Sequence, residues 1–213
     1  MKKHTNPLDS LINHLDSALR TIGGAEGHGQ RANPAEKFHD TKLDDTQKKL
    51  VSGLMRINHA GEIAAQGLYQ GQSLTAKLPE VREAMDQAAQ EETDHLNWCH
   101  HRLNELNSHR SLLNPLWYTG AFGMGALTGL IGDKWSLGFV AETEKQVVSH
   151  LDKHLQRLPV HDGKSRAILQ QMKSDEQHHA TTALDAGGAE LPAPAKILMK
   201  GLSKVMTLTA FRL

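Results

Sequence analysis

The sequence predicts an all-α protein: a bundle of four long helices with a long apolar crossover and an additional C-terminal amphipathic helix. Aromatic residues make up only 4% of the 213 residues, which is fewer than β-sandwiches and barrels normally need. Four long segments repeat apolar residues at helical spacing, and no strand pattern of comparable length occurs. Because an uncharged stretch separates the second segment from the third, we expect a bundle with one long crossover.

Residues 1–44 are expected to form an N-terminal amphipathic segment followed by a linker. Apolar side chains recur at helical spacing within residues 8–22, and glycines and Pro34 then interrupt the pattern, so residues 23–43 are the predicted linker. The N-terminus has neither the apolar core of a signal peptide nor the composition of a transit peptide, which predicts a cytoplasmic protein or one on the cytoplasmic membrane face. The apolar positions are Leu8, Leu11, Ile12, Leu15, Leu19 and Ile22.

Residues 45–213 are expected to form one domain that contains the bundle. Asp44 and its neighbours offer an N-cap to the first long helix, and Pro79 suits the first turn of the second. Asp133 opens the third helix, which ends before Pro159, and a pair of glycines stops the fourth. The predicted helices span residues 45–77, 79–106, 133–158 and 163–187.

The crossover at residues 111–132 is 22 residues long and carries no charge, nominally enough to span about 30 Å of hydrocarbon. It also contains Pro115 and five glycines, so we expect an interfacial or partly inserted segment rather than a transmembrane helix. Trp117 and Tyr118 are expected at the level of the lipid headgroups.

The C-terminal segment after Pro194 is predicted to be an amphipathic helix. Lys196, Lys200 and Lys204 form a basic stripe at a spacing of four residues, and apolar side chains such as Leu202 occupy the opposite side. Such a helix is typical of an anionic membrane surface. We therefore expect peripheral attachment to the cytoplasmic face of the cell membrane; the alternative is that both apolar segments pack on each other or on a partner subunit.

Carboxylates and histidines interrupt the apolar stripes near the middle of all four long helices. An isolated carboxylate in a core must be paired, protonated or bound to a metal. A dinuclear cation would neutralise several such groups at once, so we expect a metal centre inside the bundle. Glu144 is preferred over Glu142 because it alone continues the apolar stripe of its helix. The candidate metal-ligating and catalytic residues are Glu62, Glu92, His95, Glu144, Glu176 and His179.

The spacing of these residues is an internal repeat. Glu62 precedes Glu92 by 30 residues and Glu144 precedes Glu176 by 32, and a histidine follows three residues after each second glutamate. Two copies of E…E-x-x-H on core faces are typical of ferritin-like proteins with two iron or two manganese ions. Mixed carboxylate and imidazole ligands suit Fe or Mn, and the single cysteine argues against an iron–sulfur cluster or a structural zinc.

Several further residues carry two interpretations each. Asp175 and Glu91 each directly precede a glutamate of the repeat, and they either orient metal-bound histidines or belong to the surface. His150 is a proton donor near the site or, as the favoured alternative, a solvated or packing residue. Cys99 is expected to be a small buried apolar residue rather than a ligand. The net charge of zero and the absence of a binding motif argue against nucleic acid as a partner.

Five stretches of the sequence resemble the demethoxyubiquinone hydroxylase family of ubiquinone biosynthesis, in its bacterial branch. The resemblance covers roughly residues 45–213, and implies that this part is a ferritin-like di-iron hydroxylase domain whose six candidate residues bind two Fe ions. The stretches are Ile57–Glu62, Glu92–Leu96, Asn114–Trp117, Ala141–Glu144 and Asp175–His179.

The resemblance also implies the reaction and the partners. A di-iron monooxygenase of this kind uses O₂ to hydroxylate the ring of 2-polyprenyl-3-methyl-6-methoxy-1,4-benzoquinol, and two reducing equivalents come from the quinol or from an external donor. The expected partners are this quinol, the membrane lipid surface and other ubiquinone-biosynthesis proteins. The alternatives are a ferritin-like iron-oxidising or peroxide-scavenging protein, a manganese catalase, or a non-enzymatic helical protein that binds membranes.

Overall fold

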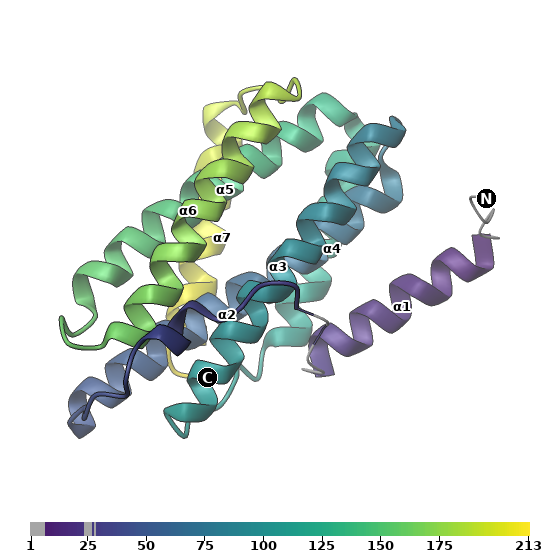
Figure 1. The fold of residues 1–213 in the computed structure, drawn as a ribbon. Helices are drawn as coiled ribbons and strands as arrows, with labels where there is room; N and C mark the ends of the chain where they lie inside the picture. Colours follow the sequence, from purple (N-terminus) through teal and green to yellow (C-terminus); the bar gives the residue numbers. More distant parts are fainter. Residues whose placement is uncertain (1–6, 24–26, 28) are drawn as a thin grey trace.

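The computed structural model describes residues 7–23, 27 and 29–213, and every regular element in this part of the chain is helical (Figure 1). This confirms the all-α prediction, and the ends of the four long helices lie within about three residues of their predicted positions. The elements are α1 (Pro7–Gly23), the 3₁₀ helix η1 (Pro34–Lys37), α2 (Asp45–Thr75), α3 (Pro79–Glu105), α4 (Asn114–Ile131), α5 (Asp133–Arg157), α6 (Gly163–Asp185) and α7 (Ala193–Ala210).

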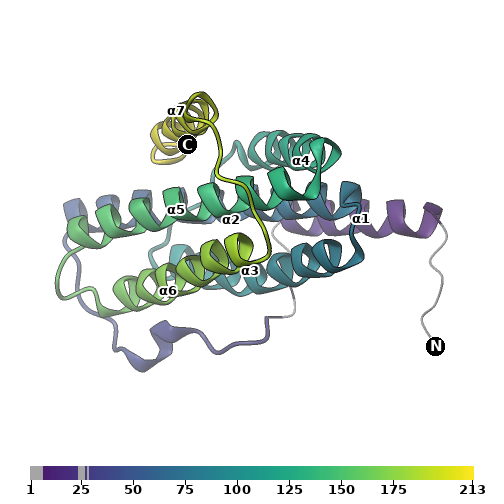
Figure 2. The same cartoon turned by 90° about the horizontal axis from the view of Figure 1, so that it is seen from above.

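The four long helices form two layers (Figure 2). Helices α2 and α5 make one layer, and α3 and α6 make the other. Helices α4 and α7 lie on the outer side of the α2–α5 layer, while the segment that contains η1 runs along the outer side of the α3–α6 layer. The bundle is therefore covered on two opposite faces by elements that are not part of it.

Local sequence signals explain where the long helices begin. The side chain of Asp44 accepts a hydrogen bond from the backbone N–H of Gln47, and the side chain of Gln47 accepts one from the backbone N–H of Asp44. This capping box satisfies two amide groups that a helix start leaves without partners. Pro79 occupies the first turn of α3, where its missing N–H costs nothing. Gly132, with a φ of 143°, turns the chain from α4 directly into α5.

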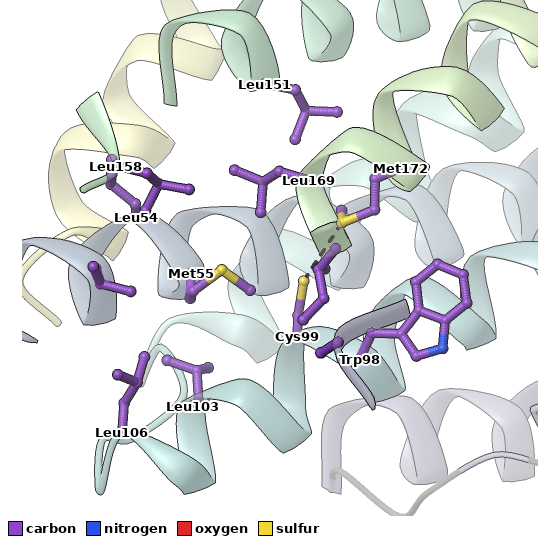
Figure 3. Close-up of a cluster of buried hydrophobic side chains, with 13 residues drawn as sticks. Leu54, Met55, Trp98, Cys99, Leu103, Leu106, Leu151, Leu158, Leu169 and Met172 are labelled. Carbon is purple, nitrogen blue, oxygen red and sulfur yellow. Dashed lines mark hydrogen bonds between the residues drawn. The ribbon is translucent and has the colours of Figure 1, made fainter. Parts of the chain in front are cut away.

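Two apolar clusters separate the middle of the bundle from its ends. In the first, Leu54 and Met55 of α2 pack with side chains from α3, α5 and α6 (Figure 3). Cys99 is fully buried in it, with its Sγ 3.8 Å from Sδ of Met172, in agreement with its predicted apolar role. The second contains Tyr69, Val81, Met85 and Val140, among others. Residues that lie between the two clusters along each helix are thus held by closely packed side chains on both sides.

The crossover is a regular helix that lies against the backbone of α2. A Cβ atom on Gly67 would come within 2.5 Å of the carbonyl oxygen of Tyr118, and one on Gly125 would collide with the carbonyl of Leu68. The glycines of both helices therefore permit a close approach that larger residues would prevent. Within the described residues no helix is long and apolar enough to cross a membrane.

The expectation that Tyr118 lies at lipid headgroups is wrong. Tyr118 is buried, and its hydroxyl donates a hydrogen bond of 2.6 Å to Oε1 of Gln70. The physical reason is the rotation of α4 about its axis, which directs this side chain toward α2, where Gln70 accepts a hydrogen bond from the phenol hydroxyl. Trp117 is half-buried.

The predicted N-terminal amphipathic segment corresponds to α1. Its residues Ala18 and Ile22 pack against a cluster of Ile63, Leu96 and Tyr118, whereas Ile12 and Leu19 are exposed. The side chains of Leu8, Leu11 and Leu15, and the position of Gly24, lie outside the described part of the chain. The predicted linker, residues 23–43, contains the 3₁₀ helix η1.

Candidate metal centre

The structure brings all six candidate residues together between the two apolar clusters. Glu62 comes from α2, Glu92 and His95 from α3, Glu144 from α5, and Glu176 and His179 from α6. None of the six exposes more than 9% of its surface. The helical periodicity explains this, because residues spaced three or four apart on each helix share its core face. Glu142 contacts Gln146 and Lys196 instead, at the rim of the bundle.

The carboxylates of Glu92 and Glu176 lie between the two histidines. Glu92 directs Oε2 toward Nδ1 of His95, at 3.0 Å, and Oε1 toward Nδ1 of His179, at 3.2 Å. Glu176 directs Oε1 toward Nδ1 of His95, at 3.2 Å, and Oε2 toward Nδ1 of His179, at 3.1 Å. Each of these two carboxylates thus presents one oxygen to each side, as a ligand that bridges two cations does.

Glu62 and Glu144 complete the two sides. Oε2 of Glu62 lies 3.6 Å from Nδ1 of His95, which assigns this carboxylate to the His95 side. Oε1 of Glu144 accepts a hydrogen bond of 2.6 Å from the hydroxyl of Tyr69, a fully buried residue of α2. Only one of the two carboxylate oxygens of Glu144 accepts this bond from Tyr69. No pattern in the sequence indicated that the hydroxyl of Tyr69 contacts a candidate ligand.

Asp175 and Glu91 hold the outer nitrogens of the two histidines. Nε2 of His95 lies 2.9 Å from Oδ2 of Asp175, and Nε2 of His179 lies 2.7 Å from Oε2 of Glu91. Such carboxylates orient an imidazole so that its other nitrogen faces a metal, and they raise its basicity. Of the two interpretations left open by the sequence, these contacts favour the orienting role.

The pKa shifts in the cluster indicate an excess of buried negative charge. Burial and the neighbouring charge of Glu92 raise the pKa of Glu62 well above its usual range, and burial together with Glu176 and Glu92 does the same for Glu144. Burial by itself would lower the pKa of His179, but its contacts with the carboxylates of Glu176 and Glu92 raise it to about 12. Protons on these groups thus reduce the buried negative charge that bound cations would otherwise balance.

The residues fit a metal centre by three criteria. One ligand atom from each of Glu62, Glu92, His95 and Glu176 lies within 4.8 Å of the others. The buried Oε1 of Glu92 lacks a hydrogen-bond partner among the described residues, although it faces His179. Oxygen and imidazole nitrogen are ligands that iron and manganese accept. The His95 side and the His179 side can each hold one cation, with Glu92 and Glu176 shared between them.

An apolar cavity of about 490 Å³ leads to this centre. Its walls come mainly from α2, α4, α5 and α7, and its lining includes Glu62, Glu144 and, from α6, Glu176. The side chains of α4 and α7 that line it include Leu116, Trp117, Leu202, Val205 and Met206. His150 also lines the cavity, and burial lowers the pKa of its imidazole. The cavity can therefore accept a long apolar molecule and present one end of it to the carboxylates.

Three contacts near the centre had no clear sequence signal. Arg31, from the predicted linker, forms ion pairs with Asp94 and Asp175. Nδ1 of His154 lies 2.8 Å from the amide oxygen of Asn58 in the interior. The local sequence around Arg31 and His154 does not distinguish them from surface residues. Their partners lie 60 or more residues away in the chain, so no spacing pattern links them.

Comparison with known proteins agrees with this geometry. A family model described as "Ubiquinone biosynthesis protein COQ7" matches residues 49–210. A Pseudomonas syringae protein named 3-demethoxyubiquinol 3-hydroxylase is 56% identical over 212 residues, covering 100% of this chain and 99% of the relative. A protein of the same name from Pseudomonas putida is 55% identical over 100% of this chain and 99% of its own length. Another from Acinetobacter baumannii is 57% identical over 99% of this chain and 100% of its own length.

Proposed function

The chain belongs to the family of ubiquinone biosynthesis protein COQ7 and is a hydroxylase of ubiquinone biosynthesis, and we propose that it hydroxylates the ring of 2-polyprenyl-3-methyl-6-methoxy-1,4-benzoquinol with O₂. The observation that carries this proposal is the apolar cavity that ends at the carboxylates of the candidate metal centre. A polyprenyl quinol has the matching shape, since its isoprenoid tail is long and apolar and only its ring is polar.

We propose that the centre holds two iron ions: Glu62 and His95 would hold one, Glu144 and His179 would hold the other, and Glu92 and Glu176 would contribute to both. Bound iron would supply the activation of O₂ that a closed-shell organic ring cannot achieve alone. One oxygen atom of O₂ enters the ring as a hydroxyl group and the other leaves as water. The balance requires two electrons and two protons, which the quinol or an external donor provides.

The chain itself contributes binding, orientation and the exclusion of water. The apolar lining from α4 and α7 surrounds the tail and keeps bulk water from the buried carboxylates. Asp175 and Glu91 hold His95 and His179 with Nδ1 directed inward. His150, whose pKa burial lowers, is a neutral imidazole in the cavity wall and can accept a hydrogen bond from a hydroxyl group of the quinol ring.

We further propose that the protein attaches peripherally to the cytoplasmic face of the cell membrane through α4 and α7. Both helices lie on the same side of the bundle (Figure 2), and both expose large apolar side chains beside the cavity. Lys200 and Lys204 of α7 are exposed and suit anionic headgroups, whereas Lys196 pairs with Glu190 at 2.9 Å. The exposed apolar residues of the two helices are Leu116, Leu127, Leu130, Ile131, Ile197, Leu198, Leu202, Val205 and Leu208.

The alternative of an iron-oxidising or peroxide-scavenging protein is not favoured. Iron ions and hydrogen peroxide are small and polar, and neither needs a 490 Å³ apolar cavity. Other ubiquinone-biosynthesis proteins remain proposed partners of the same apolar side.

The proposal is tested by reconstituting the purified protein with Fe²⁺ without oxygen and adding demethoxyubiquinol and ¹⁸O₂. We expect two irons per chain and a product that carries one ¹⁸O atom in its new hydroxyl group. A correctly folded protein that binds fewer than two metal ions, or that consumes O₂ without labelling the quinol, would contradict it.

A further inference from the structure

The chain before α2 reaches the outer side of α3, close to the metal centre. The backbone N–H of Gln30 donates a hydrogen bond of 2.7 Å to Oδ1 of Asp94, and the side chain of Asn97 donates one of 3.1 Å to the carbonyl of Gly27. Gly29 permits this approach, because a Cβ there would lie 2.8 Å from the same Asp94 oxygen. The segment follows the α3–α6 side of the bundle in Figure 1.

Arg31 joins α3 to α6 from this segment. Its Nε donates a hydrogen bond of 2.9 Å to Oδ2 of Asp94 in α3, and its Nη1 donates one of 2.7 Å to Oδ2 of Asp175 in α6. Its guanidinium carbon lies 5.0 Å from the centre of the Trp98 ring. Asp94 exposes only 3% of its side chain, so this end of Arg31 is firmly anchored.

The contact with Asp175 connects Arg31 to His95. The same Oδ2 of Asp175 that accepts from Arg31 lies 2.9 Å from Nε2 of His95. The ring of Trp98, on which Arg31 lies, is itself 5.3 Å from the ring of His95. Arg31 therefore contacts both groups that fix the orientation of this imidazole.

The second histidine has no equivalent hydrogen-bonded support from an arginine within the described residues, and Arg31 acts on its carboxylate partner Glu91 only through charge. His179 contacts Glu91, and in the described part of the chain Glu91 accepts a hydrogen bond from the neutral amide of Gln87 rather than from an arginine. Glu91 exposes 39% of its side chain, whereas Asp175 exposes 17%. The two sides of the centre thus share their ligand types but differ in how firmly their histidines are held.

We propose that Arg31 is a positioning residue for His95, and that it makes the His95 side of the centre retain its metal ion longer than the His179 side. The inference rests on the proposed two-metal centre. Arg31 precedes residue 49, where the match to the family model begins, so this support comes from the segment that the sequence predicted to be only a linker. Loss of a carboxylate that orients a metal-bound histidine typically costs about 10- to 100-fold in metal affinity. Arg31 is not itself the carboxylate that orients His95: it binds that carboxylate, and its Nη2 lies 3.3 Å from Nε2 of His95, so we expect a smaller effect.

The test is the rate at which the full-length protein, loaded with Fe²⁺ without oxygen, releases iron to a ferrous chelator in excess. We expect two phases in the wild type, with Asp175→Asn accelerating one and Glu91→Gln accelerating the other. Arg31→Gln should accelerate the Asp175 phase by about three- to tenfold and the Glu91 phase clearly less, because Arg31 acts on Glu91 only through its charge. Arg31→Lys, which keeps the charge but not the forked geometry, should have an intermediate effect.

Two further variants separate positioning from general damage to the fold. Arg20→Gln removes an arginine that pairs with Asp16 on exposed α1, and it should change neither phase. Asp94→Asn weakens the anchor of Arg31 without touching Asp175, and it should accelerate the Asp175 phase. Circular dichroism checks that each variant is folded at the assay temperature.

The outcomes distinguish the inference from the function on which it rests. A wild-type protein that binds fewer than two ions contradicts the two-metal centre itself. If the wild type binds two ions but releases both at one rate, or if Arg31→Gln leaves the Asp175 phase within twofold of the wild type, the positioning role of Arg31 is wrong. Equal acceleration of both phases by Arg31→Gln would also overturn it.

Discussion

His95 of α3 and Asp175 of α6 meet between the two helices of one layer of the bundle, with Nε2 of His95 2.9 Å from Oδ2 of Asp175. The reciprocal contact joins His179 to Glu91 at 2.7 Å. Each of these acids directly precedes the E-x-x-H glutamate of its own helix and holds the histidine of the other. The two copies of the repeat therefore support each other, and neither half of the centre is complete without the opposite helix.

Glu144→Ala is expected to abolish hydroxylation while the helix bundle survives. The change removes one proposed ligand, and it also removes a buried carboxyl group whose burial is unfavourable without a cation. Iron content should fall below two per chain, measured by elemental analysis together with the helical circular dichroism signal. Glu142→Ala is the matched control, because Glu142 lies on the same helix but contacts Gln146 and Lys196. Full activity in Glu144→Ala would remove this residue from the centre.

His154→Asn is expected to reduce the decrease in the free energy of unfolding that occurs at acidic pH. Burial, with nearby His150 and Arg157, lowers the pKa of His154 to about 4 in the folded protein, whereas the unfolded chain has the ordinary value near 6.5. Between these values the unfolded state binds more protons, so this residue makes folding less favourable as the pH falls from about 6.5 to 4. The full effect is about 3 kcal/mol.

The measurement for His154 is the free energy of unfolding by urea at several pH values between 4 and 7, for wild type and variant without metal. Asparagine can still reach the amide oxygen of Asn58 that Nδ1 of His154 contacts, and any cost of lost volume is the same at every pH. The difference between the two proteins should therefore change with pH. A constant difference would show that His154 does not contribute to acid sensitivity.

The proposed membrane attachment predicts that wild type floats with vesicles rich in anionic lipid at low salt. Changing Leu116 and Leu130 together to Glu should prevent this, since both are exposed apolar side chains of α4, at 58% and 64%. Val160→Glu is the control, because Val160 is 88% exposed but lies in the turn between α5 and α6. Equal flotation of all three proteins would show that α4 does not contact the lipid.

Gly125→Ala is expected to destabilise the protein by about 1–3 kcal/mol, the usual cost of overpacking. Its new Cβ would collide with the backbone of Leu68 in α2, which cannot move aside as a flexible side chain would. Gly123→Ala is the matched control on the same helix. Nothing lies within 4 Å of a Cβ at Gly123, so alanine there should stabilise α4 by about 0.5–1 kcal/mol. Thermal unfolding of both variants tests whether the two substitutions change the stability of the protein in opposite directions.

The periodicity of the sequence was sufficient to predict the helices and the candidate ligands. Side chains three or four residues apart share one face of a helix, so apolar neighbours indicate which face is buried. That argument placed Glu144 in the core and Glu142 outside the cluster, and it required no knowledge of which helices touch. The division of the chain at residue 44 stays a prediction, although the contacts of Gln30 and Arg31 join residues before this point to the bundle.

The sequence by itself determined which residues face the interior, because that depends on local spacing, whereas the tertiary structure alone decided which of them meet. Arg31 contacts Asp175 across 144 residues, and Tyr69 contacts Glu144 across 75. Such pairs depend on the order and rotation of the packed helices, which the pattern of a single helix does not encode. The same reason explains the error at Tyr118: its aromatic ring suited a membrane interface, but the rotation of α4 turned it toward Gln70.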